Sequence, residues 1–189
     1  MPSKIREGEA ISMPRIELPI DTHVFHAFLR FETSILADEK DKKKFLDFAL
    51  KSQQEEIISV MAFVILDDEV DFLLGIRERS GAGRTACSRL KYWERFIVKE
   101  HPEEKKNIQC RNRELKQEEE ILEICRYIHM LPLTRGYVKR IRDYWWSSYQ
   151  TYRGCYFWKN LDTGPLLGYF GRDIKKSRIH FLRYHRRES

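Results

Sequence analysis

Residues 56–76 read EIISVMAFVILDDEVDFLLGI, two apolar runs joined by a short acidic stretch. The first run, residues 56–66, is rich in β-branched and apolar side chains and predicts a strand. Asp67 and Asp68 predict a turn, because short acidic side chains bond to their own backbone two residues on. EVDFLLGI, residues 69–76, then predicts the returning strand. This hairpin indicates a fold built around a small antiparallel sheet.

The returning strand places its acids on one face. Side chains alternate along a strand, so Val70, Phe72 and Leu74 share one face while Glu69 and Asp71 share the other. Two interpretations stay open for this pair. They are solvent-facing residues of a half-exposed strand, or they are part of a site.

Outward from the hairpin, THVFHAFLRF at residues 22–31 alternates as a strand does and directs Phe25, Ala27, Leu29 and Phe31 to the core. Apolar residues at helical spacing predict four main helices, at residues 37–54, about 85–99, 116–132 and 172–187. Pro132 is expected to close the third of them. The order of elements predicts an α+β fold whose small antiparallel sheet is covered on one face.

The length of 189 residues fits one domain, which we expect over residues 14–189 after a flexible leader at residues 1–13. There is no apolar run long enough for a bilayer span, so no membrane partner is expected. The four cysteines form no CxxC pair, which favours reduced thiols and a cytoplasmic protein.

The charge is distributed unevenly. Residues 133–189 carry 13 basic and 4 acidic side chains, whereas residues 1–132 carry 22 and 25. The basic portion, residues 132–189, is also rich in Tyr, Trp and Phe, a composition typical of surfaces that neutralise phosphates and stack on bases. Trp146 and Tyr149 are candidates for stacking, although the same rings equally suit a role in locking this segment to the core.

The segment RYIHMLPLTRGYVKRIRDYWWSSYQTYRG, residues 126–154, follows the pattern RYIHxNPVRAGLVxxxxDYxWSSYxxYxG. In it the chain resembles the REP-associated branch of the single-tyrosine HUH transposases. HVFHAFLRF, DEKDKKKFLDFAL and LDTGPLLGYFGRDIKKSRIHFLRY extend the resemblance to nearly the whole chain. It implies a ferredoxin-like sheet covered by helices, appended basic C-terminal helices, a nucleophile-bearing helix next to the sheet, and a bacterial, nucleoid-associated protein derived from a mobile element.

The resemblance also implies a site. The family's catalytic tyrosine falls on Tyr127, its two metal-binding histidines fall on Glu69 and Asp71, and its third ligand, an amide, falls on Leu131. Two carboxylates favour Mg²⁺ or Mn²⁺, if the site still holds an ion, and Glu123 could replace the lost amide. Leu131 cannot coordinate a metal, and an unfilled carboxylate pair repels a phosphodiester. Without an ion, no cofactor is expected.

The other histidines suggest no replacement metal centre. His23 and His26, three apart on a strand, point to opposite faces. His129 is expected to be structural. His180 and His185 lie in the basic tail, where we expect phosphate contact or solvation.

Three functions stay open. The leading one is a protein that binds single-stranded or hairpin DNA and has weakened or lost strand cleavage. The alternatives are an active transposase that forms a 5′-phosphotyrosine through Tyr127, and an interaction protein that binds no nucleic acid. Either a monomer or a homodimer is compatible with the sequence. The candidate DNA-binding residues are Arg30, Arg111, Arg135, Lys139, Arg140, Arg142, Lys175, Lys176, Arg178, Arg183, Arg186 and Arg187.

Overall fold

The computed structural model describes residues 18–51, 57–78, 80–102, 108–155, 158 and 160–186. The expected leader at residues 1–13 and Arg187 lie outside this part of the chain. The elements, in chain order, are β1 (Thr22–Phe31), α1 (Glu39–Lys51), β2 (Ile58–Ile65), β3 (Glu69–Arg77), α2 (Ala82–Glu100), β4 (Ile108–Leu115), α3 (Glu118–Thr134), η3 (Ile141–Asp143), α4 (Tyr149–Tyr152), α5 (Gly164–Tyr169) and α6 (Ile174–Arg186).

The four strands form one sheet in the order β2-β3-β1-β4, and all neighbours are antiparallel. The order βαββαβ with β1 and β3 in the centre is that of a ferredoxin-like sheet. The predicted α+β class and the β2–β3 hairpin are therefore confirmed. β4 was missed, because IQCRNREL lacks the apolar alternation of a half-buried strand and becomes a strand only by pairing with β1.

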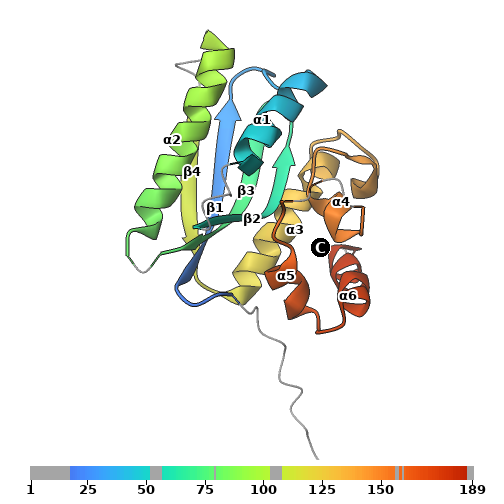
Figure 1. Cartoon of the computed structure of the whole chain (residues 1–189). Helices are drawn as coiled ribbons and strands as arrows, with labels where there is room; N and C mark the ends of the chain where they lie inside the picture. The colour runs from blue at the N-terminus through green and yellow to red at the C-terminus, as the bar shows by residue number, and fades with distance from the viewer. Residues whose placement is uncertain are drawn as a thin grey trace, which may run out of the picture.

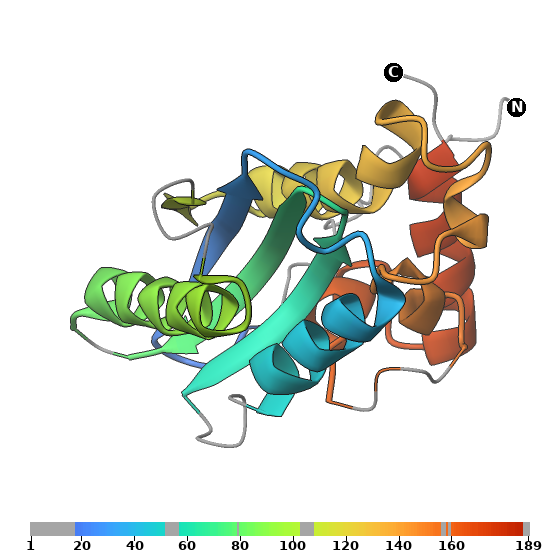
Figure 2. The same cartoon turned by 90° about the horizontal axis from the view of Figure 1, so that it is seen from above.

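Helices α1 and α2 cover one face of the sheet, as Figure 2 shows. Phe45 of α1, Phe72 of β3 and Trp93 of α2 are fully buried between these layers, with ring centroids 4.5–6.4 Å apart. On β1 the predicted core face is confirmed, since Phe25, Ala27, Leu29 and Phe31 are all buried.

Helix α3 covers the opposite face, against β2 and β3 (Figure 2). The prediction of a sheet covered on one face only was therefore wrong. Three glutamates in the first turn of α3 suit the positive end of the helix dipole. Pro132 does not close the helix, which continues to Thr134. The proline removes only its own N–H, and the Arg135 N–H still donates to the Leu131 carbonyl over 2.9 Å.

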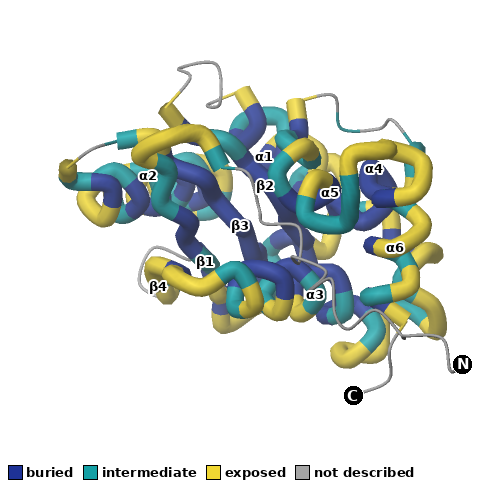
Figure 3. Tube along the Cα trace, turned by 90° about the horizontal axis from the view of Figure 1, so that it is seen from below, coloured by how far each residue is buried: buried dark blue, intermediate teal, exposed yellow. Residues whose placement is uncertain are grey.

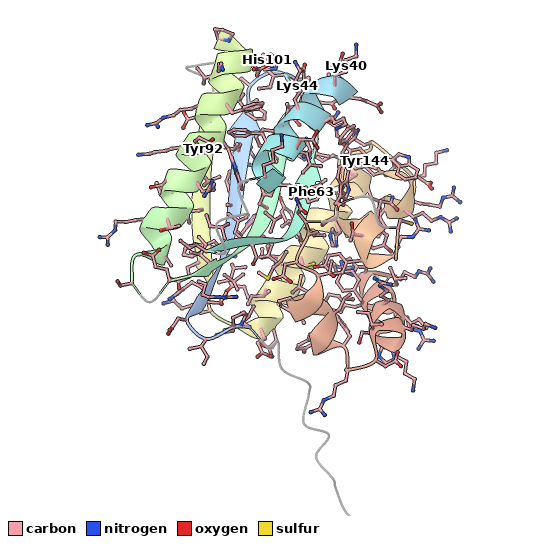
Figure 4. All side chains as sticks on the ribbon, viewed as in Figure 1. Lys40, Lys44, Phe63, Tyr92, His101 and Tyr144 are labelled. Carbon is pink, nitrogen blue, oxygen red and sulfur yellow. The ribbon has the colours of Figure 1, made fainter. Side chains whose placement is uncertain are left out.

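The segment around residues 144–152 is docked on the outer edge of β2. The Ile65 N–H donates to the Trp146 carbonyl over 2.9 Å, and the Ser148 N–H to the Phe63 carbonyl over 3.0 Å. The Tyr144 hydroxyl donates to the Ile65 carbonyl over 2.6 Å, and Figure 4 labels Tyr144 and Phe63 on the two sides of this junction. The C-terminal helices α4, α5 and α6 consequently lie beside the β2 edge of the sheet (Figure 1).

Burial differs sharply between the strands. β2 and β3 are buried along nearly their whole length, whereas β4 at the other edge is mostly exposed or half-buried (Figure 3). Glu69 and Asp71 thus stand in the most enclosed part of the sheet. Within the described residues, no helix has the length and apolar character needed to cross a membrane.

Candidate functional site

Glu69 and Asp71 lie on the face of β3 that α3 covers. Only 1% of Glu69 and none of Asp71 is exposed to solvent. The interpretation of this pair as solvent-facing residues on a half-exposed strand was therefore wrong. Its sequence argument gave the correct face of the strand, but it did not include a helix on that face.

Glu69 is held between two arginines. Its Oε1 accepts from Arg30 Nε over 2.7 Å, and its Oε2 accepts from Arg135 Nη2 over 2.9 Å. Arg30 is the cross-strand neighbour of Glu69 on β1, whereas Arg135 follows the last residue of α3. Burial raises the pKa of Glu69 and the neighbouring Asp71 adds to this, while Arg30 acts in the opposite direction. The hydrogen bond to Glu69 in turn raises the pKa of Arg30.

Asp71 has one engaged and one open oxygen. Its Oδ1 lies 2.7 Å from His26 Nε2, while its Oδ2 is buried and has no hydrogen-bond partner within the described part of the chain. A buried carboxylate oxygen without a donor is unfavourable, because the group loses its water and gains nothing in return.

Tyr127 of α3 stands beside this pair. Its ring meets that of His26 edge-on, with centroids 5.9 Å apart, and 39% of the residue is exposed. Burial raises the pKa of the Tyr127 phenol, and the charges of Asp71 and Glu69 raise it further. The phenol is therefore protonated at neutral pH. The structure thus brings together Tyr127, Glu69 and Asp71, which the sequence comparison had aligned with a catalytic site.

The residue aligned with the third ligand, Leu131, and its possible substitute, Glu123, lie in different environments. Leu131 is buried, at 3% exposure, and Glu123 is exposed. Burial raises the pKa of the Tyr184 phenol on α6, and the charge of Glu123 raises it further. Within the described residues, no group of three His, Cys, Asp or Glu side chains with mutually close ligand atoms includes Glu69 or Asp71.

A second buried polar cluster joins α3 to α6. His129 Nδ1 lies 3.0 Å from His185 Nε2, and His129 Nε2 lies 2.7 Å from Ser148 Oγ. His185 Nδ1 donates to the Phe181 carbonyl over 2.9 Å. Because burial keeps both rings neutral, His185 Nε2 accepts from His129 Nδ1. Burial lowers the pKa of His185 to about 4 and that of His129 well below its usual value.

This cluster corrects one prediction and fits another. His129 has the structural position expected of it. His185 is only 2% exposed, so phosphate contact or solvation was the wrong interpretation for this residue. Cys125, one turn before His129, adds its thiol to the cluster at 3.8 Å from His129 Nδ1. Cys125 and His129 have helical spacing, but only the fold brings His185 to them from 56 residues away.

The predicted basic residues fall into three groups. Arg30 of β1 is paired with Glu69, so it projects on the α3 side of the sheet. Phe28 is two residues before Arg30 and shares its face, and Arg111 of β4 is paired with Phe28, so Arg111 projects on the same side. The turn after α3 carries exposed Arg135, Lys139, Arg140 and Arg142, and α6 carries Lys175, Lys176, Arg178, Arg183 and Arg186. Among the α6 residues Arg178 is half-buried and the others are exposed.

The aromatic residues proposed for stacking are not the accessible ones. Tyr149 is 3% exposed, and Trp146 is half-buried with its ring centroid 6.0 Å from that of Trp158. Their burial fits the role in locking this segment to the core. Among the described residues of the basic portion, 132–189, Trp145 and Tyr137 carry the exposed aromatic rings, at 57% and 38% exposure.

No family model matches the chain, and no curated protein matches it either. Among solved structures, the chain is similar to a REP-associated tyrosine transposase bound to a REP hairpin, with a TM-score of 0.50 and 16% sequence identity. The similarity covers 82% of this chain and 88% of the transposase. The chain has the fold of a REP-associated tyrosine transposase.

Proposed function

We propose that the protein binds single-stranded or hairpin DNA and that its capacity for strand cleavage is weakened or lost. Support for DNA binding comes from the transposase with the same fold, which was solved bound to a REP hairpin. Further support comes from the exposed basic residues after α3 and on α6.

The observation that carries the loss of cleavage is the pairing of Glu69 with Arg30 and Arg135. A divalent cation at the positions of the expected ligands would have to displace two guanidinium groups, which also repel it. Asp71 offers a single open oxygen, and neither Leu131 nor Glu123 supplies a third ligand there. These residues do not fit the metal site that the resemblance implies.

One observation favours the alternative of an active enzyme. Tyr127 is accessible, and its ring meets that of His26, which contacts Asp71. Among the described residues, no donor reaches Asp71 Oδ2. A phosphotyrosine linkage would form by attack of the Tyr127 hydroxyl on a phosphodiester, with loss of its proton and departure of a 3′-hydroxyl.

A covalent-adduct assay separates these functions. Purified protein is incubated with end-labelled hairpin DNA and Mg²⁺ or Mn²⁺, then denatured and separated by size. We expect salt-sensitive binding in gel shifts and no adduct. An adduct that forms with the unmodified chain and is lost in Tyr127→Phe would contradict the loss of cleavage. Absence of binding to single-stranded, hairpin and duplex DNA near 50 mM salt would instead favour the interaction protein.

A further inference from the structure

A cavity of about 750 Å³ lies between α3, η3, α4 and α6. Arg126, Met130 and Leu133 line it from α3, with the i, i+4, i+7 spacing of a single helix stripe. Tyr127 lies about 100° around the helix from Arg126 and faces His26 of β1. The cavity and the Tyr127 site therefore occupy different flanks of the same helix.

The lining of the cavity combines apolar and cationic side chains with the rings of Tyr149 and His185. Four aliphatic or thioether side chains provide apolar surface: Met130, Leu133, Ile141 and Leu182. Five guanidinium groups surround them: Arg126, Arg140, Arg142, Arg153 and Arg186. None of the described lining residues is acidic.

The positive charge is only partly compensated by neighbours. Arg140 and Arg142 share one acid, Asp143, at 2.8 and 3.9 Å. Arg153 donates to neutral acceptors, the Gln150 side chain at 2.9 Å and the Arg142 carbonyl at 3.4 Å. Among the described residues, the lining therefore holds more cationic than anionic groups, which favours an anion.

The loop that carries Arg140 and Arg142 is fixed in place. Gln150, which is 1% exposed, donates from Nε2 to the Arg142 carbonyl over 2.7 Å and to the Tyr144 carbonyl over 3.0 Å. A fixed rim lowers the entropy lost when a ligand binds.

We infer that this cavity is a subsite for one nucleoside monophosphate unit. Arginine forks bind phosphate oxygens in pairs, and apolar surface accepts the face of a base. A bare phosphate would leave the apolar wall unused, and an uncharged ligand would leave the arginines unused. The volume lies within the 300–1000 Å³ that is typical of small-molecule sites.

Two sources supply this unit, an unpaired nucleotide of a bound DNA strand and a free mononucleotide. The first of them rests on the proposed function. Its test compares a blunt hairpin with the same hairpin extended by unpaired nucleotides at the 5′ or the 3′ end, one of them 2-aminopurine. Fluorescence anisotropy gives the Kd, and 2-aminopurine emission reports the environment of the base. A titration with free dAMP, followed by calorimetry, tests the second source.

Matched variants on α6 separate the cavity from general charge. Arg186 lines the cavity and Arg183 does not, and both are exposed. We expect one of the tailed hairpins to bind the unmodified protein about tenfold more tightly than the blunt hairpin, from one or two charged hydrogen bonds. Arg186→Gln should remove most of this advantage. Arg183→Gln should weaken both hairpins alike.

A filled cavity gives a test that changes no charge. Met130→Trp should abolish the advantage of the tailed hairpin and its change in 2-aminopurine emission. Ile179→Trp, on the exposed side of α6, should leave both unchanged. Thermal melts of each variant establish that it is folded.

The outcomes are distinguishable. Equal affinity for blunt and tailed hairpins, together with no binding of dAMP, overturns the subsite while leaving hairpin binding intact. Binding of dAMP by a protein that binds no DNA supports the subsite and overturns the proposed function. If neither ligand binds, both are overturned.

Discussion

At the level of single residues, the buried Glu69 forms ion pairs with arginines that the sequence alone does not identify as its partners. The alternation of EVDFLLGI correctly predicts that Glu69 and Asp71 share a face. Their burial depends on α3, and the partners of Glu69 come from β1 and from the residue after α3. No local pattern around Glu69 points to Arg135, which lies 66 residues away.

The first prediction concerns the pair of Arg30 and Glu69. Arg30→Gln should lower the free energy of unfolding by about 1–3 kcal/mol, because a buried carboxylate then keeps only one cationic partner. The double variant Arg30→Gln/Glu69→Gln should recover part of this loss. Urea unfolding of both single variants and the double variant gives the coupling energy.

Arg111→Gln is the control for this cycle, since Arg111 is exposed on the same face of the neighbouring strand. It should change stability by less than about 0.5 kcal/mol. A coupling energy near zero between Arg30 and Glu69 would show that the carboxylate does not depend on this arginine.

The second prediction concerns His185. Its native pKa of about 4 lies below the ordinary value, so the unfolded chain binds a proton that the native state excludes. Stability from this group is complete above pH 6.5 and is lost as the pH falls towards 4. Between pH 7 and pH 5 the loss should be about 2 kcal/mol for this histidine.

Urea unfolding as a function of pH measures this slope. His185→Gln should flatten it, even if the variant is less stable at every pH. His180→Gln, an exposed position on the same helix, should preserve it. A slope that is unchanged in His185→Gln would assign the acid sensitivity to other groups.

At the level of elements, the sequence predicts those whose side chains carry a periodic pattern. The core face of β1 and the basic helix α6 follow from alternation and helical spacing. β4 has no such pattern. It is an edge strand that pairs only with β1 among the described strands, and its exposed positions accept charged side chains such as Arg111 and Arg113. The prediction that α3 ends at Pro132 was two residues too early. A proline in the last turn removes one hydrogen bond, and the helix tolerates this loss.

The third prediction tests the junction between elements. Ser148 Oγ accepts from the Phe63 N–H over 2.9 Å and also contacts His129, so it connects β2, α3 and the start of α4. Ser148→Ala leaves a buried N–H and a buried ring nitrogen without partners, and should cost about 2–4 kcal/mol.

The matched control is Ser88→Ala on the exposed surface of α2, which should lie within about 0.5 kcal/mol of the unmodified chain. Thermal or urea unfolding measures both. A cost for Ser148→Ala no larger than that of the control would mean that water replaces the serine hydroxyl.

At the level of the whole molecule, the basic residues proposed for DNA binding lie on one side. α6 and the turn after α3 lie on the side where α3 and the C-terminal helices pack, whereas α1 and α2 form the opposite layer (Figure 2). The count of basic residues predicts that DNA binds to the C-terminal third, but the fold is needed to show that Arg30 and Arg111 of the sheet point to the same side.

The fourth prediction follows from this distribution. The logarithm of the DNA association constant should fall linearly with the logarithm of salt concentration, and the slope should decrease by about 0.7–0.9 for each phosphate contact removed. Lys175→Gln and Lys176→Gln should each reduce the slope, because both are exposed on α6.

Lys91→Gln on α2 is the charge-matched control, and it should leave the slope unchanged. Anisotropy titrations from 50 to 300 mM salt give the slopes. Equal effects of Lys91→Gln and Lys175→Gln would indicate binding without a defined face.

The docking of residues 146–148 on β2 also bears on how the chain is made. The hydrogen bonds that satisfy this edge of the sheet come from a segment 85 residues further along. During synthesis on the ribosome, the outer edge of β2 in the completed β2–β3 hairpin therefore lacks these hydrogen bonds until Ser148 has been synthesised. An open strand edge is a template for pairing with another chain. Translation speed between residues 77 and 148 thus governs how long the nascent protein is exposed to misassembly.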